Sequence, residues 1–519
     1  MNTKDKTQNS IRNSIFGITS QIIIILISFF TRSIFLRYLS EDYLGLNGLF
    51  SNVISILSLT ELGFGTAAIY ALYKPLAEQD ERNISALMNL YAKIYHVMFA
   101  VVMALGLLLL PFIKYIINDL PENIPNIHLI YLLFVLNSAL SYLFAYKRSL
   151  LFADQKNFKI SLITVIFKII LAVSQIVGLM LTRSYYVYLS AMILCGLLEN
   201  IVISKIVDRN YPYLKKYRKA QVDSETKKML KSNTKSLVVH KIGTIAVYQT
   251  DNLIISAFIN LATTGLYSNY TMITNSLQQL TNSIVEGTKA SIGIYNASET
   301  PQRRISLFKK FNLMLHLINS FCTTCLLCLF NPFIEFAFGE KYLFDLPLVL
   351  LICLDFYVRG MRVSFSTIKE TCGIFRPDRY KPILEAIVNL TLSILLVKSI
   401  GFAGIMISTI LTTLLLCYTI EIYVTCKYAF ASSPWFYYRM FFKNVFVLAI
   451  QLFITYGLCS LLPMYGFTAL VLKACVCLIV PNLINLAAYC RDQDFHALLS
   501  TAKRMLHRKF SKNPEQEAQ

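Results

Sequence analysis

The sequence is a succession of apolar stretches, each about as long as a helix that crosses a lipid bilayer. The hydrocarbon core of a bilayer is about 30 Å thick, and an α-helix needs about 20 mainly apolar residues to cross it. Stretches of about this length or longer lie at 11–36, 44–73, 88–113, 126–147, 158–182, 185–205, 236–259, 264–294, 308–336, 344–368, 380–398, 401–426, 437–460 and 467–490. The sequence therefore predicts an all-α polytopic membrane protein with about fourteen transmembrane helices.

The composition agrees with this fold class. Of the 519 residues, 55% are hydrophobic and 15% are charged, whereas a soluble domain carries about 25% charged residues. The first apolar stretch, GITSQIIIILISFFTRSIFL, has no A-x-A-like end and is longer than the apolar region of a signal peptide. We therefore expect it to stay in the mature protein as the first helix.

Positive charge is concentrated in alternate loops. A net charge of +20 raises the question of a nucleic-acid partner, but its distribution favours a membrane topology instead. The basic set comprises the N-terminus, residues 74–82, 147–159, 205–231, 301–310, 372–381 and 427–443, and the C-terminal tail. The opposite set offers little beyond Arg37, Lys114, Arg183, Lys341 and Lys398. Basic loops stay in the cytoplasm, so we expect both termini of a cytoplasmic-membrane protein to be cytoplasmic, and no nucleic-acid partner.

The longest basic loop divides the chain into two similar parts. We predict an N-terminal six-helix lobe over 1–207, a basic cytoplasmic linker over 208–233, a C-terminal six-helix lobe over 234–428, and a final helix pair with a basic tail over 429–519. The segments LGLNGLFSNVISIL and TGLYSNYTMITNSL open the second and eighth spans at an offset of 220 residues. Many transporters are built from two such repeats, with the substrate site between them.

Polar side chains recur at helical spacing within several spans. Along 264–294 these are Thr271, Asn275, Gln278, Asn282, Glu286 and Lys289; along 236–259, His240, Thr244, Tyr248 and Asp251, with Lys241 beside them; and in the tenth span, Asp355, Arg359, Arg362, Ser366 and Lys369. Asp355, four residues before Arg359, can neutralise the charge of that arginine. Weaker stripes include Arg32 and Lys168. A charge at membrane depth costs about 2.5–3.5 kcal/mol, so we expect these stripes to face a hydrated central cavity. The alternative, interhelical hydrogen bonding, is the one we favour for isolated residues such as Glu199 and His316.

The second span combines a carboxylate with two glycines. Glu61 is followed by Gly63 and Gly65, which lower helix stability and allow bending or close approach. A bendable helix with a polar face suits the wall of a cavity with alternating access. The other interpretation is a packing contact of small residues, with Glu61 bonded to a neighbour.

The run YLGLNGLFSNVISILSLTELGFGTAAIYALYKPLAEQDE at 43–81, followed by NISALMNLYAKIY, resembles the N-terminal region of bacterial polysaccharide flippases. These belong to the superfamily of multidrug, oligosaccharidyl-lipid and polysaccharide exporters. The resemblance implies a two-lobed carrier that moves undecaprenyl-diphosphate-linked oligosaccharide repeat units across the cytoplasmic membrane by alternating access, for surface polysaccharide assembly. It implies no catalytic step and no cofactor, and it suggests polysaccharide polymerase and glycosyltransferases as partners.

Candidate site residues come from the stripes. A guanidinium group binds phosphate through two parallel donors, and amides can hydrogen-bond sugars. The candidate substrate-binding residues are Arg359, Arg362, Lys289, Lys241, Arg32, Lys168, Asn275, Gln278 and Asn282. The candidate ion-coupling residues, for a proton or a sodium ion, are Glu61, Asp251 and Glu286.

We expect no metal site. Eleven of the twelve cysteines lie at or after Cys322, almost all in apolar runs. The motif CTTCLLC at 322–328 lacks the fourth ligand of an iron–sulfur site, so we expect these cysteines to be small packing residues.

Two other functions compete with the flippase. An ion-coupled multidrug exporter of the same superfamily has the same architecture, but a cavity for cations should be rich in carboxylates, and the stripes hold at least as many Lys and Arg residues. A polysaccharide polymerase or membrane glycosyltransferase is expected to need a sizeable outward loop. The longest one, near 114–126, is too short for that purpose.

The alternating loop charge gives a topology that reporter fusions can test. A reporter fused after Asp223 should be active in the cytoplasm, and one fused after Asn123 should be active outside it, because only the first loop is strongly basic. Alkaline phosphatase and green fluorescent protein fusions measure the two sides. Reversed activity at both positions contradicts the predicted topology.

Overall fold

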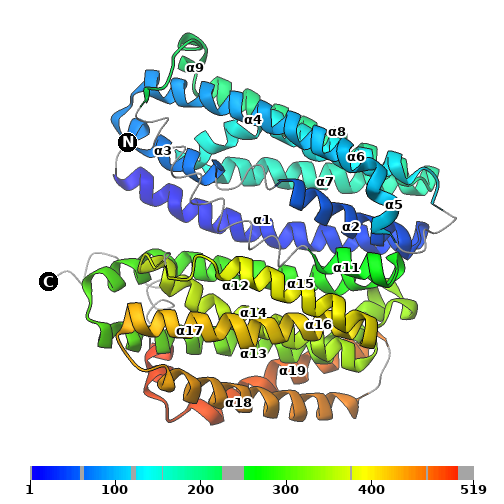
Figure 1. The fold of residues 1–519 in the computed structure, drawn as a ribbon, viewed down its shortest axis with the longest axis vertical. Helices are drawn as coiled ribbons and strands as arrows, with labels where there is room; N and C mark the ends of the chain where they lie inside the picture. The colour runs from blue at the N-terminus through cyan, green and yellow to red at the C-terminus, as the bar shows by residue number, and fades with distance from the viewer. Residues whose placement is uncertain are drawn as a thin grey trace. The chain divides into compact units, whose positions relative to one another are not determined.

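The computed structural model describes residues 3–58, 64–117, 124–154, 156–224, 250–374, 377–462 and 466–500. All regular secondary structure in these ranges is helical (Figure 1). The first part contains α1 (Thr3–Tyr38), α2 (Glu41–Leu57), α3 (Phe64–Glu78), α4 (Glu81–Leu109), the 3₁₀ turn η2 (Leu110–Phe112), α5 (Ile113–Ile116), α6 (Ile127–Ala153), α7 (Asn157–Thr182), α8 (Tyr185–Asn210), α9 (Tyr213–Lys216) and α11 (Asp251–Phe258).

The second part begins with two helices of 38 residues, α12 (Leu261–Ser298) and α13 (Pro301–Phe338). It continues with η3 (Glu340–Tyr342), α14 (Leu346–Thr371), α15 (Lys381–Ile400), α16 (Phe402–Leu411), η4 (Thr412–Tyr418), α17 (Thr419–Thr425), η5 (Cys426–Phe430), α18 (Trp435–Ser460) and α19 (Phe467–Tyr489). The segments η4 and η5 have π-helical hydrogen bonding, so the residues from α16 to η5 form one irregular helix.

Ten helices in the described ranges are long and apolar enough to cross a membrane. Each matches one of the predicted spans, and the four predicted spans without a match are 44–73, 236–259, 264–294 and 344–368. The last two nevertheless form the long helices α12 and α14, whose polar stripes lower their hydropathy. The chain is therefore an all-α multi-pass membrane protein, as predicted, while the count of fourteen spans stays a prediction.

The chain forms two compact units. The first contains residues 1–269 and 382–405, and the second contains 270–381 and 406–519. The lobe boundaries expected from the sequence stay a prediction, because residues 225–249, where the linker would end and the second lobe would begin, lie outside the described ranges.

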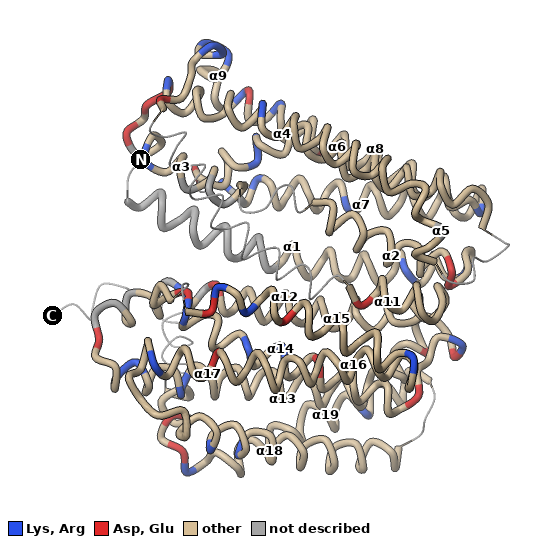
Figure 2. Tube along the Cα trace, in the orientation of Figure 1, with Lys and Arg blue, Asp and Glu red and all other residues tan. Residues whose placement is uncertain are grey.

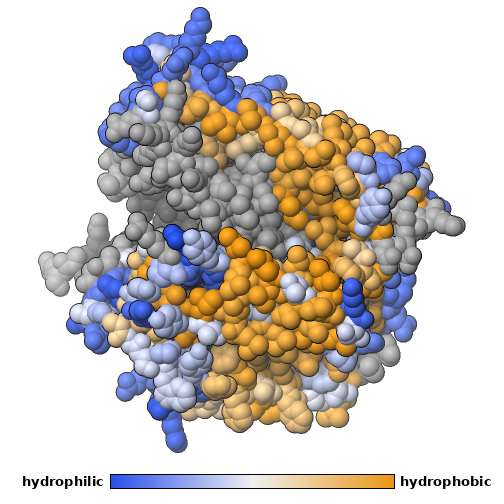
Figure 3. All heavy atoms as spheres, viewed as in Figure 1, coloured by the Kyte–Doolittle hydropathy of each residue, from blue (hydrophilic) through white to orange (hydrophobic). Residues whose placement is uncertain are grey.

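In the first unit, α6 packs between α4 and α8, and α7 packs between α8 and α1. Along α7 large apolar side chains such as Leu162, Ile166 and Val173 are exposed, as on a face that contacts lipid. Figure 3 shows the same apolar character over α6 and α8, and a hydrophilic surface at α9. The unit thus has an apolar belt over α6, α7 and α8 and a charged end at α9.

The basic loops of the first unit meet at that charged end (Figure 2). Lys147 at the end of α6 binds Asp208 at the end of α8 at 2.7 Å, and the Tyr211 hydroxyl donates to Asp154 at 2.5 Å. Burial, together with Asp154, raises the pKa of Tyr211 well above its usual value. Loops that the positive-inside rule assigns to one side of the membrane therefore lie together.

The second unit is built around α13. This helix packs against α14, α18 and α19, and Phe308 near its start contacts Phe365, Phe430 and Tyr437 in an aromatic cluster. The aromatic cluster joins α13 to α14, which carries several of the charged groups described below, and to η5 and α18.

In the first unit, α2 and α12 cross with their backbones in contact. A Cβ atom on Gly45 would overlap the carbonyl oxygen of Leu261, and one on Gly265 would overlap the carbonyl oxygen of Glu41. The two contacts are reciprocal, because Glu41 and Gly45 correspond to Leu261 and Gly265 at the repeat offset of 220. A local two-fold axis produces this pattern, in which each helix offers the same surface to the other.

Substitution of either crossing glycine should destabilise the protein. Gly45→Ala or Gly265→Ala forces the two backbones apart, and overpacking of this kind costs about 1–3 kcal/mol. Gly457→Ala on α18 is the matched control, because a Cβ there meets nothing within 4 Å and alanine favours a helix. The melting temperature of the detergent-purified protein should fall for the first two variants only. Equal melting temperatures for all three would refute the close crossing.

Candidate functional site

Three basic side chains surround one buried carboxylate in the second unit. Arg362 and Lys369 lie two turns apart on α14, Lys381 begins α15, and Glu421 comes from α17. Oε1 of Glu421 lies 3.1 Å from Arg362 Nε and 3.8 Å from Lys369 Nζ, and it also contacts Lys381 Nζ. We call Arg362, Lys369, Lys381, Glu421 and Asp378 the charge cluster; Asp378, before α15, pairs with Lys369.

The charged side chains of the charge cluster are largely buried. The side chain of Glu421 is 2% exposed and that of Lys381 is 6% exposed. Removing such ions from water costs several kcal/mol each, and the cost is recovered only when charges and hydrogen bonds are matched. Several cations of the cluster share one carboxylate oxygen. An anionic ligand with several oxygens can therefore replace that oxygen and still give each cation an anionic partner.

The expected partner of Arg359 is present one turn earlier on α14. Asp355 accepts a hydrogen bond from Arg359 Nε at 2.8 Å, and both side chains are largely buried. The sequence predicted this pair from the spacing of four residues. It did not anticipate Glu421 beside Arg362, although a carboxylate within the apolar span 401–426 was a visible signal, and it did not select Lys381.

The polar stripe of α12 lies on the surface of its unit. Asn275 and Asn282 are exposed and Gln278 is partly buried, and these three amides have no hydrogen-bond partner in the described part of the chain. Lys289 instead binds Glu286 at 3.0 Å and Glu370 at 2.5 Å. The three amides are therefore available to a ligand, whereas Lys289 already has carboxylate partners.

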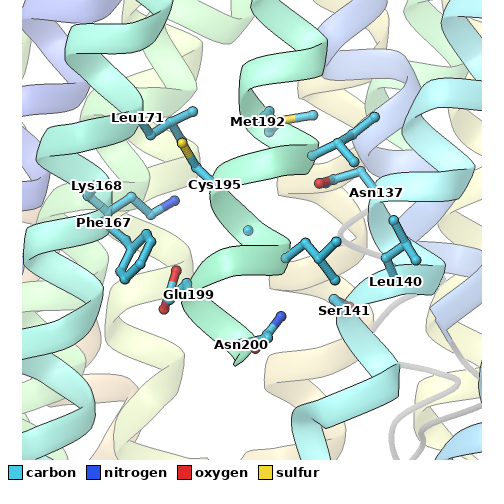
Figure 4. A pocket seen from close by; sticks show the side chains of 13 residues that line it. Asn137, Leu140, Ser141, Phe167, Lys168, Leu171, Met192, Cys195, Glu199 and Asn200 are labelled. Carbon is cyan, nitrogen blue, oxygen red and sulfur yellow. The ribbon is translucent and has the colours of Figure 1, made fainter. Parts of the chain in front are cut away.

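A separate pocket lies between α6, α7 and α8 of the first unit. It has a volume of about 220 Å³, and its polar lining comes from Asn137, Ser141, Lys168, Glu199 and Asn200 (Figure 4). Across the described residues Lys168 has no ion-pair partner. This pocket places one candidate residue, Lys168, beside neutral hydrogen-bonding groups and a carboxylate.

Glu199 is tied into the helix packing around that pocket. It lies 2.8 Å from Arg148 Nη2 and accepts a hydrogen bond from Thr164 at 2.8 Å. The expectation that this isolated residue forms interhelical bonds is confirmed. His316, another such residue, contacts the Tyr357 hydroxyl at 2.9 Å.

Arg32 connects α1 to α12. Its Nη1 donates to the Ser268 hydroxyl at 2.8 Å and to Asn269 Oδ1 at 3.0 Å. Both acceptors are neutral and lie one turn beyond the crossing of α2 and α12. Arg32 is thus held near that crossing by two neutral acceptors.

The candidate ion-coupling residues are only partly described. Glu61 and the candidate Lys241 lie outside the described ranges. Asp251 begins α11 in the first unit and is 5% exposed, and Glu286 lies exposed on α12 in the second unit. The described contacts do not join these carboxylates to each other.

Comparisons with known proteins agree with this architecture. The structure resembles the lipid II flippase MurJ in an inward closed conformation, with a TM-score of 0.61, 15% identity, and coverage of 93% of this chain and 99% of that chain. It resembles an inward-facing multidrug resistance MATE family transporter of the MOP superfamily, with a TM-score of 0.63, 11% identity, and coverage of 80% and 98%. It also resembles a MATE transporter of Vibrio cholerae, with a TM-score of 0.56, 12% identity, and coverage of 84% of this chain and 100% of that chain.

At these identities the similarity concerns the fold alone, and a comparison with curated protein sequences finds no match. The sequence profile of a family described as polysaccharide biosynthesis protein matches residues 10–290. This match spans more than half of the 519 residues. The chain therefore belongs to the polysaccharide biosynthesis protein family, with a fold shared by transporters and flippases of the MOP superfamily.

Proposed function

We propose that the protein is a flippase that moves undecaprenyl-diphosphate-linked oligosaccharide repeat units across the cytoplasmic membrane by alternating access, for surface polysaccharide assembly. The observation that carries the proposal is the charge cluster, in which Arg362, Lys369 and Lys381 share Glu421 within the helices of a membrane protein. Membership of the polysaccharide biosynthesis family supports the glycan part of the substrate. No chemical step is required of the protein.

The charge cluster suits a diphosphate for a geometric reason. A diphosphate presents several anionic oxygens, and a guanidinium group binds two of them through parallel donors, whereas an ammonium group acts as a point charge. On arrival of the substrate, a phosphate oxygen takes the place of Glu421 Oε1 on Arg362. Arg359, Lys289, Lys241, Arg32 and Lys168 remain candidate contacts for an anionic headgroup, although Lys289 has carboxylate partners in the structure.

The neutral part of the substrate fits the stripe of α12. Asn275, Gln278 and Asn282 offer amide donors and acceptors that suit sugar hydroxyls. The polyprenyl tail stays in the hydrocarbon core, where it is soluble, so the site has to bind only the headgroup and the sugars.

The main alternative is an ion-coupled multidrug exporter, because solved MATE family transporters share the fold. A site for organic cations requires a carboxylate that is not held by other cations. In the charge cluster Glu421 is already shared by three cations, which favours an anionic substrate. A membrane polysaccharide polymerase is a weaker alternative, because the longest outward loop expected from the sequence, near 114–126, is short.

Both termini are assigned to the cytoplasm, and glycosyltransferases and a polymerase are the expected partners in the pathway. The cation-rich loops support this orientation through the positive-inside rule.

Arg362 tests the diphosphate contact. Arg362→Ala should abolish surface polysaccharide at normal levels of inserted protein, because hydrogen bonds to charged groups contribute about 1.5–3 kcal/mol each. Arg362→Lys should restore part of the activity. Surface polysaccharide in a complemented deletion strain, normalised to membrane-inserted protein, measures both. Arg303→Ala is the control, because Arg303, in the first turn of α13, also pairs with a carboxylate, that of Glu299, but its side chain is 68% exposed.

A double variant separates binding from folding. Arg362→Ala leaves Glu421 with one cation fewer, so the added substitution Glu421→Gln should restore any lost insertion. The double variant should nevertheless stay inactive, since the phosphate contact is still missing. Normal polysaccharide with Arg362→Ala, or in the double variant, would refute the assignment.

Ion coupling is tested with vesicles. We propose that Asp251 exchanges a proton or a sodium ion, so that an imposed gradient accelerates transport of lipid-linked substrate in wild-type vesicles. Asp251→Asn should remove this response, while Asp223→Asn, in the predicted linker, should keep it. If wild-type vesicles transport the substrate at the same rate with and without an imposed proton gradient or sodium gradient, the coupling is excluded.

A further inference from the structure

Three cysteines from three helices meet inside the second unit. Cys328 comes from α13, Cys459 from the end of α18 and Cys477 from α19. Their sulfur atoms all lie within 4.8 Å of one another. All three side chains are buried, with exposed fractions of 4%, 3% and 1%. We call these residues the thiol cluster.

The thiol cluster is not the motif that the sequence displays. Of the cysteines in CTTCLLC, only Cys328 takes part. Cys325, one turn earlier, lies partly buried beside the cluster, and its sulfur is 3.9 Å from the carbonyl oxygen of Cys477. The three ligands are brought together by the packing of α18 and α19 on α13, which the sequence spacing does not reveal.

The spacing of the sulfur atoms suits one metal ion. A thiolate binds zinc at about 2.3 Å, so the sulfurs of three thiolates around one ion lie about 4 Å apart by trigonometry. The observed limit of 4.8 Å requires a contraction of less than about 1 Å. Soft ligands of this kind select thiophilic ions over magnesium or calcium.

A buried lysine beside the cluster balances the charge. Lys473 precedes Cys477 by one turn on the buried face of α19 and is 7% exposed. The Cys459 thiol donates to the Lys473 carbonyl oxygen at 4.0 Å, so this residue borders the cluster. In the described ranges Lys473 has no ion-pair partner.

We propose that Cys328, Cys459 and Cys477 bind one thiophilic divalent cation, such as zinc or cadmium. Each thiol loses its proton to the solvent when it becomes a ligand, so binding releases three protons. Three thiolates, one divalent cation and the Lys473 ammonium group then sum to zero charge, which apolar surroundings favour. The bound ion fastens α18 and α19 to α13.

Cadmium alone is a suitable probe. The purified full-length protein, kept reduced with a phosphine, is titrated with Cd²⁺, and the ultraviolet absorption of sulfur-to-cadmium charge transfer is followed. We expect saturation at one ion per chain. Cys328→Ser, Cys459→Ser and Cys477→Ser should each lose this absorption, while Cys475→Ser, on an exposed position of α19, should keep it.

Thermal stability provides a second readout on the wild-type protein. Cadmium at about 100 times its dissociation constant shifts the unfolding equilibrium about 100-fold toward the folded state, so the melting temperature should rise, and the rise should vanish in the three cluster variants. Mg²⁺ is the comparison ion, because soft thiolates bind this hard cation weakly, and we expect no rise in melting temperature with it.

Several results would overturn the proposal. Absence of charge-transfer absorption at saturating Cd²⁺ shows that the thiols only fill space. Equal absorption in the Cys477→Ser variant, with loss in the Cys475→Ser variant, shows that exposed cysteines bind the ion. A disulfide between two cluster cysteines in the reduced protein, detected by peptide mass, also excludes the site.

Discussion

The cost of placing charge in a hydrocarbon environment governs the arrangement of this protein. The ten helices that meet the requirements of a span each contain a long apolar stretch with few charges, whereas α14 carries several charged residues and α12 a long polar stripe, and neither meets those requirements. An isolated ion at membrane depth is unfavourable, so the charges of α14 occur as sets: Arg359 with Asp355, and Arg362 and Lys369 with Glu421. The position of α17 follows from the same requirement, because Glu421 has to reach these cations.

The same constraint supports the proposal that the charge cluster binds an anionic headgroup. A cation whose charge and hydrogen bonds are fully matched by protein groups gains little binding energy from a ligand. A buried cation that lacks any partner destabilises the fold. Cations that share a carboxylate oxygen lie between these limits. They fold without substrate and can exchange one oxygen acceptor for another, which is what a carrier needs when it must both bind and release.

Much of the fold was predictable because membrane helices depend on length and hydropathy, which a sequence displays directly. The fold class and ten of the spans were predicted from apolar length, and the Asp355–Arg359 pair from its spacing of four residues. Contacts between distant helices were not, since periodicity assigns a residue to a face without naming what lies opposite. Glu421 beside Arg362 and the meeting of Cys328 with Cys459 and Cys477 are of this kind. Glu61 and Lys241 lie outside the described ranges, so their predicted roles stay predictions.

The crossing of α2 and α12 has a consequence for energetics. Gly45 meets the backbone of Leu261 as Gly265 meets that of Glu41, so exchanging the two helices regenerates the same pair of contacts. A pivot with this property does not favour tilting one helix over tilting the other. Under the proposed alternating access, two conformations related by such an exchange would have the same contacts at this crossing, so an energy difference between them would come from groups elsewhere, such as Arg32 on Ser268 and Asn269.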